Sequence, residues 1–252
     1  MLDLNNPDTR ESVLLERLSS GSSLVAAALA EELGLSVHTI RRDLISLEQK
    51  GVVRRVRGGA IPVSKPSPSY LVRAEHDLED VTALAERAVG SVPERGTIFM
   101  DAGTTMDAVA RRLPLGFEGL VVTPAPSVAL LALERGARVH LIGGALCASG
   151  AMAAGGEAER SVATIAADVC FLGACGLWPD FGLSAEDAGE AGIKRAMALS
   201  ANSSVVVASA SKFERRGRHK VLESGEIHVI VTDAPPERTD PFSSAGVEFV
   251  HV

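Results

Sequence analysis

Residues 36–62, SVHTIRRDLISLEQKGVVRRVRGGAIP, decide the fold of the N-terminal part of the chain. Ser36 is a favourable helix N-cap, because its hydroxyl can accept from a first-turn amide that has no helical partner. Apolar residues then recur at helical spacing, at Val37, Ile40, Leu44 and Leu47. This pattern predicts an amphipathic helix over residues 36–50.

A short basic hairpin is predicted directly after this helix. Gly51 ends the helix, residues 52–57 have strand character, and Gly58 and Gly59 permit a tight turn. The polar face of the helix carries hydrogen-bond donors suited to phosphates and base edges. A helix followed by a basic hairpin is the layout of a winged helix and indicates DNA binding. The predicted DNA-contacting residues are Ser36, His38, Thr39, Arg41, Arg42, Arg54, Arg55 and Arg57.

Two further helices are predicted upstream, over residues 9–18 and 24–33. Gly34 is a suitable C-cap for the second, and only Leu35 separates it from Ser36. This is the short turn of a helix-turn-helix. Turn, cap, polar face and basic hairpin coincide, so the sequence predicts a mostly α-helical winged helix-turn-helix.

Charge is distributed unevenly along the chain. The formal net charge is −7, yet residues 36–65 carry seven basic and two acidic side chains. Because a protein that is acidic overall can still present one basic face to DNA, the local excess outweighs the total.

Composition bounds the remaining alternatives. The 252 residues are 46% hydrophobic, and the sequence contains no apolar run long enough to span a bilayer. Residues 1–12 lack the pattern of a signal peptide, so we expect a cytoplasmic protein. Cys147, Cys170 and Cys175 have no metal-ligand spacing. Nucleophile-elbow and P-loop motifs are absent from the sequence. No catalytic residue, metal or cofactor is therefore predicted.

Residues 64–69, SKPSPS, are the clearest linker, because proline and small polar residues favour an extended spacer. The predicted domains are therefore 1–63, the winged helix; 64–76, the linker; and 77–252, a larger domain.

The larger domain alternates helical and strand patterns. Strands are predicted at 97–100, 120–123, 139–142, 169–173, 205–208 and 229–232, with helices at 78–92, 104–113, 127–134 and 188–200. This alternation indicates βαβ units, an α/β fold and a mostly parallel sheet.

Ligands of such sheets bind at the carboxyl ends of the strands. There, residues 101–105, DAGTT, offer hydroxyls, exposed amides and the positive end of a helix dipole, which suits a phosphate. An ordinary helix cap explains the same residues. Gly143 and Gly144 follow another strand, where either close approach to a ligand or plain turn geometry accounts for them.

Charged residues complete the candidate set. Glu190 and Lys194 are spaced i, i+4, which is more typical of a solvated helix pair than of a binding site. Lys212, just after a predicted strand, is better placed to meet an anion.

With these motifs assembled, the chain resembles the DeoR family of transcription regulators over residues 9–234. The most specific parts are residues 36–44, SVHTIRRDL, and 57–60, RGGA, which look like the family's recognition helix and wing. Tyr70 and Arg73 fit the segment that leads into the sensor domain. Residues 101–105 and 211–213, SKF, look like the sensor's signatures.

The resemblance implies a sensor related to ribose-5-phosphate isomerase and CoA-transferase folds, which binds phosphorylated sugars or their metabolites and so releases a repressor from its operator. It implies that Asp101, Gly103, Thr104 and Thr105 surround the phosphate and that Glu190, Lys194 and Lys212 line the rest. With Gly143, these are the predicted effector-binding residues.

Two positions depart from the family pattern. Pro124 stands where the family usually has Asn, and Ser209 where it usually has Asp. These changes imply an altered ligand, weaker binding or a sensor that no longer responds.

The leading hypothesis is a sequence-specific repressor, not an enzyme, which binds double-stranded operator DNA as a homodimer or homotetramer. The alternative is a sugar-phosphate isomerase or CoA-transferase-like enzyme with a DNA-binding head. Glu190 is the best candidate for its base, but Lys194 could neutralise it.

Overall fold

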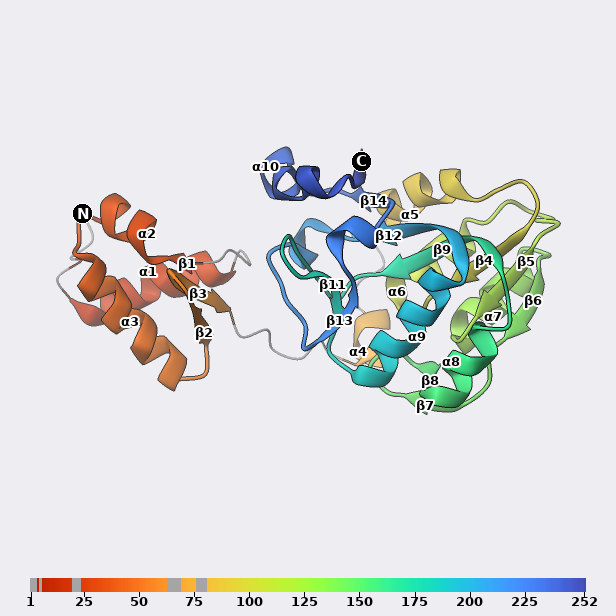
Figure 1. Ribbon diagram of the computed structural model, residues 1–252, viewed down its shortest axis with the longest axis horizontal. Helices are drawn as coiled ribbons and strands as arrows, with labels where there is room; N and C mark the ends of the chain where they lie inside the picture. Colours follow the sequence, from red (N-terminus) through yellow and green to blue (C-terminus); the bar gives the residue numbers. More distant parts are fainter. Residues whose placement is uncertain (1–3, 5, 20–23, 63–68, 76–80) are drawn as a thin grey trace. The chain divides into compact units, whose positions relative to one another are not determined.

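The computed structural model describes residues 4, 6–19, 24–62, 69–75 and 81–252. The chain divides into two compact units, Met1–Lys65 and Pro66–Val252 (Figure 1). Of the predicted linker, residues 64–76, only 69–75 are among the described residues. The predicted limits at 63 and 76 therefore lie outside them.

The first unit is a winged helix-turn-helix. Its elements are α1 (Pro7–Ser19), β1 (Leu24–Val25), α2 (Ala26–Glu32), α3 (Val37–Gln49), β2 (Val53–Val56) and β3 (Gly59–Pro62). The strands form an antiparallel sheet in the order β1-β3-β2. The second helix begins later than predicted, because Leu24 and Val25 pair with β3 instead.

Local signals place the ends of α3 as predicted. The Ser36 hydroxyl accepts from the backbone N–H of Thr39 at 3.0 Å. Gly34 and Gly51, on either side of the helix, have φ of +64° and +71°, values that favour glycine. Ile40, Leu44 and Leu47 are buried, whereas Val37 is 36% exposed and is not part of the apolar stripe.

The second unit is built on a seven-stranded sheet in which every pair of neighbours is parallel. In spatial order the strands are β15 (Glu248–His251), β14 (Val229–Thr232), β12 (Ala201–Val207), β9 (Ala167–Gly173), β4 (Thr97–Met100), β5 (Leu120–Thr123) and β6 (Arg138–Leu141). The α/β fold with a mostly parallel sheet is thereby confirmed.

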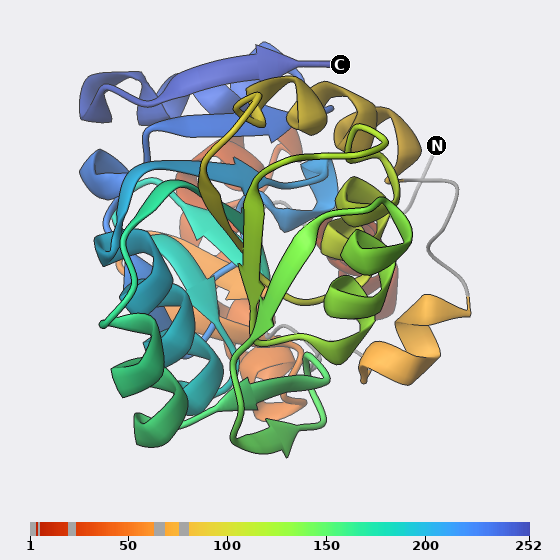
Figure 2. The ribbon, with the colours of Figure 1, turned by 90° about the vertical axis from the view of Figure 1, so that its right-hand side faces the viewer.

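Helices cover both faces of this sheet (Figure 2). One face carries α5 (Thr82–Ala88), α6 (Thr104–Arg111) and α7 (Pro126–Glu134), and the other carries α8 (Gly156–Val162) and α9 (Ala188–Leu199). Ile98, Phe99 and Met100 of β4 are all fully buried. Burial on two faces explains why the central strands are continuous apolar runs.

Strand order reverses between β4 and β9. From β4 the chain proceeds to β5 and β6 on one side, whereas from β9 it proceeds to β12, β14 and β15 on the other. In open α/β sheets such a reversal opens a crevice at the carboxyl ends of the two central strands. The candidate ligand residues 101–105 follow β4 directly.

Several smaller elements were not predicted. They are α8, β15, α4 (Tyr70–Ala74), the hairpin β7 (Ala145–Cys147) and β8 (Met152–Ala154), the antiparallel sheet β10 (Gly176–Trp178), β11 (Gly182–Ala185) and β13 (His219–Leu222), α10 (Pro236–Thr239), and 3-10 turns at Ala210–Lys212, Ser224–Glu226 and Asp240–Ala245. The predicted helix over 78–92 ends in a 3-10 turn at Val89–Ser91. Among the described helices, none has the length and apolar character needed to cross a bilayer.

Candidate functional site

A cavity of about 170 Å³ lies at the crevice between the carboxyl ends of β4 and β9. Its walls come from α4, the start of α6, the turn after β9, α9 and the turn after β12. The lining includes Arg73, Gly103, Thr104, Thr105, Gly150, Cys175, Glu190, Lys194, Ser209, Ser211 and Lys212. Six of the eight predicted effector residues are among them.

Asp101 lies fully buried beneath this cavity. Its N–H donates to the Phe171 carbonyl at 3.0 Å, which ties the end of β4 to β9. Its Oδ2 accepts from the N–H of Gly173 at 2.9 Å and lies 2.7 Å from Nζ of Lys194. Asp101 is therefore a support for the cavity, one layer below the lining residues.

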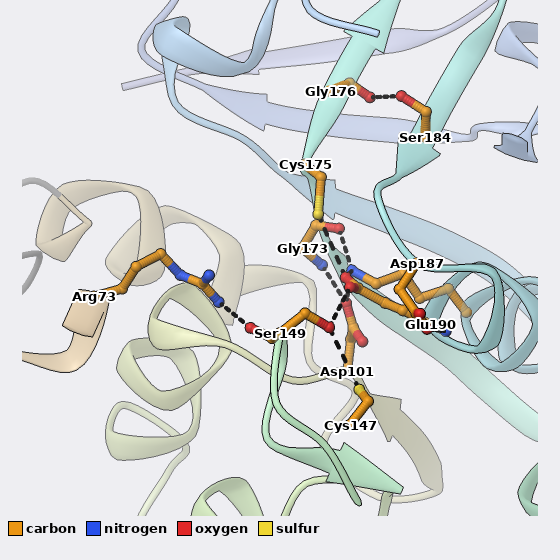
Figure 3. A network of polar contacts seen from close by, with 11 residues as sticks. Arg73, Asp101, Cys147, Ser149, Gly173, Cys175, Gly176, Ser184, Asp187 and Glu190 are labelled. Carbon is orange, nitrogen blue, oxygen red and sulfur yellow. Dashed lines mark hydrogen bonds and ion pairs between the residues drawn. The ribbon is translucent and has the colours of Figure 1, made fainter. Parts of the chain in front are cut away.

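Glu190 and Lys194 are both buried on α9, and Lys194 contacts Asp101. Figure 3 shows Glu190 next to Asp101. Lys194 Nζ is 3.1 Å from Glu190 Oε1 and donates to the Gly173 carbonyl at 3.0 Å. The two residues are only 5% and 3% exposed. The expectation that this spacing marks a solvated pair is wrong, because α9 turns this face toward the strand ends.

Both members of this pair are charged. Burial alone would lower the pKa of Lys194, but the nearby carboxylates of Asp101 and Glu190 raise it above its ordinary value. Burial opposes ionisation of Glu190 as well. The attraction of Lys194 and the hydrogen bonds of that residue, Cys175 and Ser149 together lower the pKa of Glu190. The cavity floor is thus a fixed ionic cluster.

Two residues that sequence reasoning missed also hold Glu190 (Figure 3). Ser149 Oγ donates to Oε2 at 3.3 Å, and the Cys175 thiol to Oε1 at 3.4 Å. Burial raises the pKa of Cys175 to about 11, so this thiol stays protonated. Cys175 follows the end of β9, just as Asp101 follows the end of β4. This position at a strand end could have marked Cys175 as a site residue in the sequence. Ser149 lies in a hairpin that no periodicity marked.

The upper wall of the cavity suits an anion. Gly103 caps α6 with φ of +103°, a value that favours glycine, and Thr104 and Thr105 begin the helix there. First-turn amides of a helix lack intrahelical partners and attract negative charge. Lys212 approaches from the turn after β12, and Arg73 from α4.

The charges around the cavity leave a positive excess. Three cations, Arg73, Lys194 and Lys212, face two carboxylates, Glu190 and Asp101, so the net formal charge is +1. Ser209 lines the cavity and adds no charge; its hydroxyl lies 2.9 Å from that of Ser211. A carboxylate at this position would cancel the excess.

Two singled-out positions are not among the described residues that line the cavity. Gly143 is exposed just beyond β6. Pro124 follows β5, and its carbonyl accepts from the N–H of Ala153 at 2.8 Å, which holds strand β8 in place. The hydrogen bond to Ala153 connects Pro124 to the hairpin rather than to the cavity lining.

In the first unit, the predicted DNA-contacting side chains fall on α3 and the wing. His38, Arg41 and Arg42 are exposed on α3, and Arg54 and Arg57 on the wing. Within the described residues, none of these four arginines takes part in an ion pair. Together they form a basic face whose arginines have no carboxylate partner among the described residues.

Two other charged residues of this unit have structural partners. Asp43 accepts from Arg10 of α1 through both oxygens, at 2.7 and 2.9 Å, and both side chains are mostly buried. The carboxylate that would repel phosphate thus braces α3 against α1.

Arg55 is bound by Glu48, with Nε to Oε2 at 2.7 Å, and its backbone N–H donates to the same carboxylate. Unlike Arg54 and Arg57, Arg55 is turned back onto α3.

A winged helix followed by an α/β unit with a polar cavity at its strand ends defines a transcription regulator that carries a sensor domain. The family model for the DeoR-like helix-turn-helix domain matches residues 10–65, and that for the DeoR C-terminal sensor domain matches residues 78–234. The chain belongs to the DeoR family of transcriptional regulators.

Curated relatives match over nearly the full length. The HTH-type transcriptional regulator GlpR of Haloferax volcanii is 34% identical, with 97% of each chain covered. The putative aga operon transcriptional repressor of Escherichia coli O157:H7 is 30% identical, with 96% of this chain and 93% of the relative covered. The glycerol-3-phosphate regulon repressor of Escherichia coli K12 is 29% identical, with 90% and 91% covered.

Proposed function

We propose that this protein is a repressor that a phosphorylated sugar or related metabolite releases from its operator. The observation that carries the proposal is the cavity itself. It combines the N-terminus of α6, two flanking cations and a net positive charge. The name of the glycerol-3-phosphate regulon repressor among the relatives agrees with this ligand class.

The ionic cluster beneath the cavity supports recognition of the ligand's hydroxyl groups. Glu190 is held by Lys194, Ser149 and Cys175, so its carboxylate has a fixed orientation. Fixed acceptors of this kind discriminate strongly between ligands with and without a matching hydroxyl. Phosphate contacts would come from the amides of Thr104 and Thr105 and from Lys212, with Gly103 allowing close approach.

We also propose that the site binds its ligand without turnover. A general base works best when its pKa lies near the operating pH. Lys194 and the two hydrogen-bond donors hold the pKa of Glu190 below its ordinary value. This carboxylate is therefore a weak base and a good acceptor, which favours a sensor over an isomerase.

On the DNA side, α3 would enter the major groove with His38, Thr39, Arg41 and Arg42, while Arg54 and Arg57 contact phosphates from the wing. Ser36 would position the first turn, and Arg55 would reach DNA only by leaving Glu48. Because paired half-sites would multiply the affinity of one head, we propose that the protein acts as a homodimer or homotetramer in the cytoplasm.

The test uses the full chain and an operator selected from random DNA by repeated binding. Affinity for this operator and for a scrambled duplex would be measured with glycerol 3-phosphate, ribose 5-phosphate and fructose 1-phosphate, with the unphosphorylated compounds as controls. One ester should weaken operator binding on the order of tenfold or more, about 1.4 kcal/mol. Turnover of ribose 5-phosphate would be followed in parallel.

Lys212→Gln should lose the response to the ester, and Arg87→Gln, which removes an exposed charge from α5, should keep it. Equal affinity for selected and scrambled DNA would overturn the specific regulator. A response to none of the esters would overturn the effector class, and turnover abolished by Glu190→Gln would revive the enzyme.

A further inference from the structure

Helix α4 joins the DNA-binding unit to the sensor. It follows the last strand of the wing, β3, which ends at Pro62, and it is part of the second compact unit. Any change in how firmly α4 is held on the sensor therefore alters the restraint on the chain that leads to the winged helix.

Polar contacts rather than apolar burial attach α4 to the sensor. Tyr70 Oη donates to Asp107 Oδ2 on α6 at 2.7 Å, and Arg73 Nη2 donates to the Ser149 carbonyl at 3.1 Å. No residue of α4 is buried, and Leu71 and Val72 are 72% and 47% exposed. Because apolar burial is the dominant favourable term in folding, α4 is held weakly and its attachment is adjustable.

Arg73 carries one of these contacts into the cavity. Its side chain lines the cavity, and a Cβ added at Gly103 would lie 3.9 Å from Nη2. The guanidinium is thus next to the N-terminus of α6, where the amides of Thr104 and Thr105 begin the helix. A planar guanidinium with several donors can hold a backbone carbonyl and an anion together.

Ser149 links this contact to the cavity floor (Figure 3). Its carbonyl accepts from Arg73, while its hydroxyl donates to Glu190. One turn of the β7–β8 hairpin therefore touches both the segment that leads from the DNA-binding unit and the buried ionic cluster.

We propose that Arg73 is an anion ligand supplied by the interdomain segment, so that a bound phosphate joins α4 to the N-terminus of α6. The inference rests on the proposed function, in which the cavity takes a phosphorylated metabolite. It adds the route of regulation, because effector binding then tightens α4 on the sensor.

Chymotrypsin provides the test on the full chain, since α4 contains Tyr70 and Leu71 and must open locally to be cut there. The rate of cleavage after these residues would be measured by mass spectrometry, with inorganic phosphate and with each of the three esters. Consider a ligand that binds only when α4 is docked on the sensor. At a ligand concentration ten times its dissociation constant, cleavage should slow on the order of tenfold.

Variants separate the role of Arg73 from general stabilisation. Arg73→Gln should lose the protection, Arg73→Lys should keep part of it, and Arg87→Gln should keep all of it. Tyr70→Phe retains the cleavage site and loses the bond to Asp107, so it should be cut faster without ligand and still be protected. Fluorescence of Trp178 would verify that the sensor of each variant is folded.

Equal protection in wild type and Arg73→Gln would overturn the inference, as would absence of protection by phosphate and all three esters. Release of operator DNA by each ester, measured on the same samples, tests the proposed function separately. Arg73-dependent protection without DNA release would contradict the proposed function alone. DNA release with Arg73-independent protection would contradict only the inference.

Discussion

Lys194 and Asp101 are 93 positions apart in the chain, and their Nζ and Oδ2 atoms are 2.7 Å apart at the base of the cavity. The ammonium also contacts Glu190 and the Gly173 carbonyl, so one side chain connects α9 with the ends of β4 and β9.

Lys194→Met should destabilise the sensor by about 3–5 kcal/mol, because it leaves two buried carboxylates without their cation. Denaturant unfolding followed by fluorescence of Trp178, the chain's single tryptophan, would measure the change. Arg95→Met, which breaks an exposed pair with Glu118, is the matched control and should change stability by no more than about 0.5 kcal/mol. Similar costs for both variants would contradict a structural role for the cluster.

The stability of the sensor should fall in acid partly through Glu190. Its pKa is lowered in the folded state, so its contribution is present above the unfolded pKa of about 4.3 and is lost as the pH falls through the folded value. Glu190→Gln removes this titration. The difference in unfolding free energy between wild type and Glu190→Gln should therefore shrink between pH 6 and pH 3, and a constant difference would exclude Glu190 as a source of acid sensitivity.

Asp43→Asn should loosen α3 on α1. The change removes a charge-assisted bidentate contact to Arg10 between mostly buried side chains, at a cost of about 2 kcal/mol. Hydrogen exchange of the α1 and α3 amides should accelerate, and affinity should fall for all DNA sequences alike. Glu32→Gln, in the exposed pair with Arg17, is the control and should exchange like wild type. A loss of sequence preference alone would instead assign Asp43 to base recognition.

Arg42→Ala and Arg57→Ala should weaken DNA binding in different ways. A bidentate base contact by Arg42 would make its loss cost about 1–3 kcal/mol on the selected operator and little on scrambled DNA. A phosphate contact by Arg57 would make its loss weaken both duplexes alike and reduce the slope of log affinity against log salt by about 1. Affinities over a salt series, on both duplexes, would separate the two.

Arg55→Ala is the internal comparison for the wing. Arg55 has the same charge as Arg57 but is bound to Glu48, so its removal should change the salt slope less. An equal change in both slopes would mean that Arg55 leaves Glu48 when DNA binds.

The periodic parts of the fold could be predicted from the sequence. Residues 36–50 carry a cap, a stripe and a glycine stop in one short segment, and the central strands are apolar runs because helices cover both their faces. The small elements offered no such pattern. Strands β10 and β11 are three and four residues long, and α4 has no buried residue to set a period.

The ionic cluster could not be predicted from spacing, since a buried Glu190–Lys194 pair and a solvated one look alike in sequence. The buried pair differs by its contact with Asp101, and the order of strands in the sheet brings Asp101 next to Lys194. The orientation of Arg55 toward Glu48 could have been predicted from the strand pattern. Arg55 is two residues after the buried Val53 in a strand, so it faces the same side, toward α3.

The two outer strands of the sheet constrain how subunits can associate. β6 carries exposed Arg138 and His140, and β15 carries exposed Glu248 and His251. Charged side chains on an outer strand, here Arg138 and Glu248, disfavour edge-to-edge pairing with another chain. An assembly of this regulator should therefore leave its sheets discontinuous between subunits, and a fibre built by strand addition is a disfavoured route of aggregation.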